Sequence, residues 1–130
     1  MHKGFIITAS VLGAVAVGLG AFGAHGLKSL ASPAQLTTYE TAVKYQFYHV
    51  FALLLTALLY AHFPVNGVIV SGKMFIAGMA IFSGSLYLLT FLQIAGYNQF
   101  YWLGAITPIG GLLLVLAWVW LAISVYRYNG

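Results

Sequence analysis

Long apolar runs separated by short polar segments dominate the pattern of this chain. A helix needs roughly 20 apolar residues to cross a bilayer core about 30 Å thick. Four runs meet this requirement, and the predicted spans cover about residues 4–24, 45–62, 74–96 and 101–126. The pattern therefore predicts four transmembrane helices.

Turn-forming residues separate these runs. The breaks fall at Ser32-Pro33, at residues 64–67 and at residues 96–99, where proline, glycine and asparagine cluster. Within the runs, apolar residues are continuous rather than alternating at every second position, and four spans are too few to close a barrel. We expect an all-α membrane protein, with residues 1–130 forming one integral domain built as a four-helix bundle.

The segment before the second span has a different pattern. Ser32 is a suitable N-cap, and Pro33 then occupies the first helical position. Apolar residues recur at steps of three and four, which places them on one face of a helix: Leu36, Tyr39, Val43 and Phe47. The pattern predicts an amphipathic extension of the second helix that lies at the membrane interface or projects from it.

Glu40 and Lys44 lie on this extension in the order that favours pairing across one helical turn. Such a pair stabilises a helix by about 0.2–0.5 kcal/mol. We predict an interfacial ion pair, and separate solvated charges are the alternative.

Composition excludes a soluble domain. Apolar residues make up 62% of the chain and charged residues 5%, too few to cover a water-exposed surface. The formal net charge is +4, from five Lys and Arg residues against one acidic residue. These cations stand singly near the ends of apolar runs, a distribution that suits contact with lipid headgroups rather than nucleic acid. There is no cysteine, so disulfides and thiolate metal sites are excluded.

The first span follows a short basic start, as in a secretory signal peptide. The run is longer than a signal core, and Phe22 disrupts the small-residue pattern of a cleavage site, so we expect the span to be retained. On the side of both termini, three cations flank the spans: Lys3, Lys73 and Arg127. The other side has two, Lys28 and Lys44. The positive-inside rule then predicts cytoplasmic termini, in a multi-pass protein of the bacterial inner (plasma) membrane.

Small and weakly polar residues recur at helical spacing in every span. Helices in lipid associate through close packing of small residues and through polar contacts, so these stripes are predicted to face inward. In the first span the stripe comprises Ser10, Ala14, Gly18, Ala21 and His25. The residues assigned to helix packing are Gly18, Ala21, Ser83, Gly84, Ser85, Tyr87, Gly104, Pro108 and Gly111. Pro108 also predicts a kink in the fourth span.

Polar side chains gather in the half of the bundle opposite the termini. Since intramembrane polar groups are costly, they face a partner or a cavity. One interpretation is a shared ligand-binding pocket, and the other is separate, locally satisfied residues. The candidates are His25, Tyr45, Gln46, His49, Gln93 and Thr107. No spacing in the chain is typical of a metal or haem site, so no metal and no cofactor are predicted.

Four segments in this order resemble a known family: GAFGAHGL at 20–27, YQFYH at 45–49, FSGSLY at 82–87 and ITPIGG at 106–111. Together they resemble the domain of unknown function 423 family, also called the transmembrane protein 256 or YgdD-like family. The resemblance implies a small integral protein of bacterial inner membranes without an established activity. Its motif residues correspond here to His25, Gln46, His49, Ser83, Ser85, Tyr87, Thr107 and Pro108. Val50-Phe51 departs from the Ala-Leu usual in the family, which makes this packing surface bulkier.

Three functions are compatible with these features. No nucleophile–base pair or metal signature is present, which favours a non-enzymatic structural or accessory protein that packs with itself or within a larger membrane complex. The alternative is a small oligomeric transporter or proton-coupled carrier that uses His25 and His49. The third is a haem, quinone or lipid site in the same half of the bundle.

Overall fold

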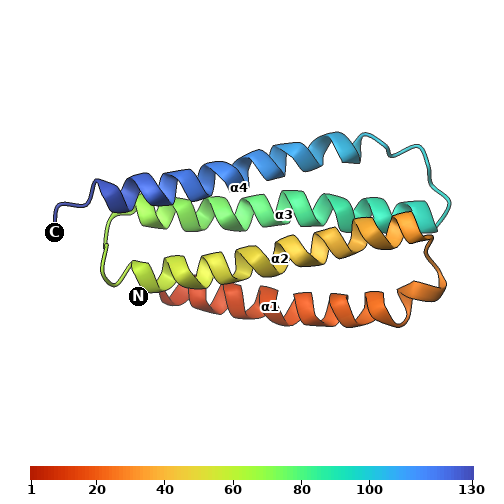
Figure 1. The fold of residues 1–130 in the computed structure, drawn as a ribbon, viewed down its shortest axis with the longest axis horizontal. Helices are drawn as coiled ribbons and strands as arrows, with labels where there is room; N and C mark the ends of the chain where they lie inside the picture. Colours follow the sequence, from red (N-terminus) through yellow and green to blue (C-terminus); the bar gives the residue numbers. More distant parts are fainter.

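Four long helices form the whole fold, as the hydrophobic pattern predicts. The computed structural model describes residues 1–130. Its helices are α1 (Lys3–Ala24), α2 (Pro33–Leu59), α3 (Asn66–Ile94) and α4 (Leu103–Tyr126), with a short 3₁₀ helix, η1 (Leu27–Ser29), between α1 and α2. All four long helices are apolar and long enough to cross a membrane. The helices run up and down, so both termini lie at the same end of the bundle (Figure 1).

Local sequence signals set the helix ends. Ser32 and Gln35 form a capping box at the start of α2, with the Ser32 Oγ accepting from the Gln35 N–H at 3.2 Å, which confirms the predicted N-cap. His2 caps α1, because its Nδ1 accepts from the Phe5 N–H at 3.1 Å. After α3, Gly96 adopts a φ of +87°, a left-handed conformation that glycine takes without steric cost.

Two helices are longer than the spans predicted for them. α3 begins at Asn66, directly after Pro64-Val65, rather than near Met74. α2 is one continuous helix from Pro33, so the predicted extension exists. The segment packs along the second half of α1, where Val43 lies beside Gly20 and Tyr39 beside Gly23. Tyr39 is buried there, and its hydroxyl donates to the Leu19 carbonyl of α1.

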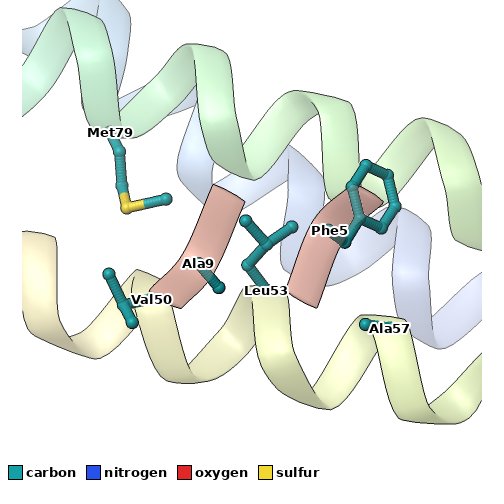
Figure 2. Close-up of a cluster of buried hydrophobic side chains, with 6 residues drawn as sticks. All are labelled: Phe5, Ala9, Val50, Leu53, Ala57 and Met79. Atoms are coloured by element: carbon teal, nitrogen blue, oxygen red, sulfur yellow. The ribbon is translucent and has the colours of Figure 1, made fainter. Parts of the chain in front are cut away.

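α2 and α3 occupy the middle of the bundle, with α1 and α4 on opposite sides of this pair (Figure 1). One apolar cluster joins α1 to α2 and α3, and Figure 2 shows its members: Phe5, Ala9, Val50, Leu53, Ala57 and Met79. A second joins α4 to the same pair, through Ala52, Val68, Phe75, Leu114, Ala117 and Leu121. The two outer helices are the least buried, so much of their surface faces lipid.

Close approach of α3 and α4 depends on Gly110. A Cβ at this position would lie 2.5 Å from the main-chain nitrogen and 2.9 Å from the Cα of Phe82. Main chain cannot move aside as a flexible side chain does, so only glycine permits this separation of the two helices. Pro108 lies two residues earlier inside the same helix and is exposed.

Candidate functional site

The polar side chains inside the bundle form interhelical hydrogen bonds. Gln46 of α2 is 5% exposed, and its Nε2 donates to the Leu12 carbonyl of α1 at 2.8 Å. Its Oε1 accepts from the Tyr87 hydroxyl of α3 at 2.6 Å. One glutamine of α2 therefore connects α1, α2 and α3 through its side-chain amide.

His49 links α2 to α4. Its Nδ1 lies 2.8 Å from the Tyr45 carbonyl, and its Nε2 lies 3.2 Å from the Trp118 Nε1. Because a carbonyl only accepts and an indole N–H only donates, this network assigns the proton to Nδ1 and the lone pair to Nε2. Both ring nitrogens of the neutral imidazole are thus in use, which leaves neither one free to bind a metal or carry a second proton in this arrangement.

Hydroxyl groups make the remaining links. The Ser83 hydroxyl of α3 donates to the Ala42 carbonyl of α2 at 2.7 Å. Ser85 of α3 and Thr107 of α4 lie with their hydroxyl oxygens 2.6 Å apart. No buried side-chain nitrogen or oxygen lacks a partner. The buried polar side chains therefore all have hydrogen-bond partners within the protein itself.

The six candidate ligand-binding residues do not share a cavity. Gln46 alone lines one of the two cavities in the structure. His25 is exposed at the C-terminal end of α1, Tyr45 is exposed on α2, and Gln93 lies partly exposed near the end of α3. His49 and Thr107 face two different helix contacts. The structure thus distributes these residues over several interfaces instead of gathering them at one site.

The roles of Tyr39 and Trp118 are not evident from the sequence pattern. Tyr39 follows the apolar face of its helix, and no motif includes Trp118. Each carries a single N–H or O–H donor on a large apolar ring, and such a donor finds a partner when it is removed from water. This rule indicates that a partner exists, but the identity of the partner emerges only when α1 and α4 are packed on α2.

The small residues predicted to face inward from the first span lie on the outer face of α1 instead. Ser10, Ala14, Gly18, Ala21 and His25 are all exposed, and nothing lies within 4 Å of a Cβ added to Gly18. A second small series faces α2: Ala9, Gly13, Ala16, Gly20 and Gly23. Its members repeat in steps of four and three, and they accommodate the bulky side chains of α2.

The other glycines predicted to pack between helices also fall into two groups, those that contact a neighbouring helix and those that do not. Gly84 and Gly104 have no neighbour within 4 Å of an added Cβ, so they do not mediate packing within one copy of the chain. A Cβ added to Gly111 would lie 3.5 Å from the Cδ2 of Phe82, which is ordinary van der Waals contact. Gly72 against Phe5 and Gly78 against Leu114 are two further positions where an added Cβ meets very tight contacts, and the sequence pattern does not indicate them.

Two cavities lie beside α1, the first where it meets α2 and α3 and the second where it meets α2 alone. The first has a volume of ≈250 Å³ and is mainly apolar, with Gln46, Ser83 and Tyr87 among its lining residues. The second has a volume of ≈200 Å³ and lies between the last turns of α1 and the first half of α2. Glu40 and Lys44 line the second cavity, and no salt bridge joins their side chains. The predicted ion pair between Glu40 and Lys44 is therefore absent, and both side chains line the cavity instead.

No three His, Asp or Glu side chains gather closely enough to hold a metal ion.

Comparison with known proteins identifies relatives that are named as membrane proteins. The family model described as "Protein of unknown function (DUF423)" matches residues 19–111. The chain belongs to this family. It is 41% identical over 128 residues to a UPF0382 membrane protein of Staphylococcus aureus, which covers 98% of this chain and 99% of that protein. It is 38% identical over 127 residues to the UPF0382 membrane protein YwdK of Bacillus subtilis, which covers 97% of this chain and 98% of that protein.

No solved structure matches the chain. As a member of the DUF423 family with four membrane-length helices, it is an integral membrane protein of unknown activity. The four motifs that carry the resemblance all lie within the residues that the family model covers, and the name of the family assigns no reaction.

Proposed function

We propose that this DUF423 protein is a non-catalytic accessory protein of the bacterial inner (plasma) membrane that acts by self-association through α1. One observation carries the proposal: α1 presents an outward stripe of small residues, and this helix is the least buried of the four. Small residues every fourth position let two helix backbones approach closely, which is how transmembrane helices associate without a hydrophobic driving force. The stripe begins with Ser10, Ala14 and Gly18 at this spacing.

Symmetry favours a second copy as the partner. Copies inserted in the same orientation are related by a two-fold axis along the membrane normal, which brings identical faces together in parallel. Parallel contact between identical small-residue stripes is the geometry of the GxxxG type of helix dimer. The opposite face of α1 is already occupied by α2, so its outward stripe remains available for this contact.

Energy transfer between labelled copies in liposomes tests the proposal. The chain has no cysteine, so a single Gly130→Cys substitution gives a unique labelling position outside the helices. Gly18→Leu is expected to weaken association on the order of tenfold, because a large side chain separates the two backbones. Gly104→Leu is the matched control, since Gly104 is also an exposed helical glycine with open space around it.

Equal association of the two leucine variants would contradict a contact through α1. Energy transfer that never exceeds the level for random mixing, at any ratio of protein to lipid, would contradict self-association altogether.

A further inference from the structure

The cavity that Glu40 and Lys44 line has the position of a lipid headgroup site. α1 has 22 residues, so it is about 33 Å long at 1.5 Å per residue, close to the thickness of a bilayer core. Its last turns, which include Gly20, Gly23 and Ala24, therefore reach the headgroup region. These three residues form the α1 side of the cavity.

The two charges lie at different depths. Val43 packs beside Gly20, and Tyr39 packs beside Gly23, nearer the end of α1. Their neighbours Lys44 and Glu40 follow the same order, so Lys44 lies about one helical turn, or roughly 6 Å, closer to the bilayer centre. The positive charge is thus deeper and the negative charge lies nearer to water.

A zwitterionic phospholipid has the complementary order. Its phosphate is attached to the glycerol close to the acyl chains, while its amine extends toward water. Carbonyl groups at the C-terminal end of a helix carry partial negative charge, so the end of α1 adds to the attraction of Glu40 for a cation. The volume of ≈200 Å³ also suffices, because a cavity of about 150 Å³ accommodates a benzene molecule.

Carboxylate chemistry distinguishes between amine headgroups. A primary ammonium donates hydrogen bonds to a carboxylate, and such charge-assisted bonds are stronger than neutral ones. A quaternary ammonium has no N–H to donate. Glu40 is the one acidic residue of the chain, and it lies at this cavity.

We propose that this cavity binds the headgroup of phosphatidylethanolamine, with the phosphate at Lys44 and the primary ammonium at Glu40. The site does not depend on self-association, because all of its residues come from α1 and α2 of one copy.

Native mass spectrometry of the full chain tests the proposal. The detergent-solubilised protein is mixed with equal amounts of phosphatidylethanolamine, phosphatidylcholine and phosphatidylglycerol that carry the same acyl chains. The monomer peak is expected to retain phosphatidylethanolamine in preference to the other two lipids. Glu40→Gln and Lys44→Gln should each lower this preference by up to roughly fivefold, because an exposed ion pair contributes at most about that factor in affinity.

Two further variants sharpen the result. The double substitution Glu40→Lys with Lys44→Glu keeps both charges and inverts their order, so the preference should disappear. Lys73→Gln is the control for loss of a cation, since Lys73 is exposed near the start of α3, at the other end of the bundle. Its lipid preference should equal that of the unmodified chain.

Equal retention of the three lipids by the unmodified chain would overturn the proposal, and this comparison requires no variant to fold. A preserved preference in the inverted double variant would also overturn it. Preference for phosphatidylglycerol that depends on Lys44 but not on Glu40 would identify an anionic-lipid site instead.

Discussion

At the scale of single residues, polar side chains in this bundle connect helices. Gln46, His49 and Ser83 each engage a group on another helix, and the buried donors and acceptors all have partners. Interhelical hydrogen bonds in membrane proteins contribute about 0.6 kcal/mol on average, because the alternative states also find partners. Their value here lies as much in fixing the relative positions of the helices as in stability.

Gln46→Leu is expected to lower the free energy of unfolding by about 1–2 kcal/mol, because the Tyr87 hydroxyl loses its acceptor. Tyr87→Phe combined with Gln46→Leu should cost less than the sum of the single changes, since no hydroxyl is then left unpaired. Unfolding in mixed micelles, followed by circular dichroism, measures both effects. Gln93→Leu is the control, because no hydrogen bond joins its side chain to another residue. Equal losses for the two leucine variants would contradict the role of Gln46.

His49 is expected to be the neutral Nδ1–H tautomer. Nitrogen NMR of the labelled protein in micelles distinguishes the two ring nitrogens and reads the tautomer directly. Trp118→Phe removes the donor to Nε2 and should shift that resonance, whereas Trp120→Phe should leave it unchanged, since the indole of Trp120 is not bonded to His49. A proton found on Nε2 would rule out the hydrogen bond from Trp118.

At the scale of helices, glycine position determines how closely neighbours approach. Gly110 of α4 faces the main chain of α3, whereas Gly104, on the same helix, faces open space. The same residue type therefore has opposite consequences at two positions separated by fewer than two helical turns.

Gly110→Ala should destabilise the bundle by about 1–3 kcal/mol, because the added methyl group forces α3 and α4 apart. Gly104→Ala should be neutral or stabilising by up to about 1 kcal/mol, since alanine has the higher helix propensity. Thermal unfolding of the two variants side by side measures the difference. Similar midpoints for both would show that the close contact at Phe82 is not needed.

At the scale of the whole molecule, an even number of spans places both termini at one end of the bundle (Figure 1). The uneven distribution of cations then predicts cytoplasmic termini. The α1–α2 connection and its headgroup cavity would face the opposite side of the membrane.

Reporter fusions measure this orientation. Green fluorescent protein fused after Gly130 should fluoresce, and alkaline phosphatase at the same place should be inactive, because each enzyme or fluorophore matures on only one side of the membrane. Phosphatase inserted beside Leu30, in the exposed α1–α2 connection, should be active. The reverse pattern would place the termini outside and would show that the three cations on their side do not set the topology.

The sequence by itself determined that the protein is surrounded by lipid, that it is helical, and where most of its helices begin and end. Continuous apolar runs in a chain with 5% charged residues permit only membrane-spanning helices. The start of α2 was also predictable, since a capping box needs only residues three positions apart. The start of α3 was misjudged, because the helix continues through Lys73, where the apolar run is interrupted although the backbone hydrogen bonds are not.

Only the tertiary structure decided which face of each helix points inward. α1 carries two stripes of small residues, one that contains Gly13 and one that contains Gly18. Both repeat at helical spacing, so periodicity does not show which of them faces α2. The choice depends on complementary bulk from α2, where Val43, Val50 and Tyr39 fill the space left by glycines. For the same reason, the polar residues near one membrane side were predictable as a group, but their partners were not. Hydrogen-bond partners lie up to 69 positions apart in the sequence, and only packing brings them together.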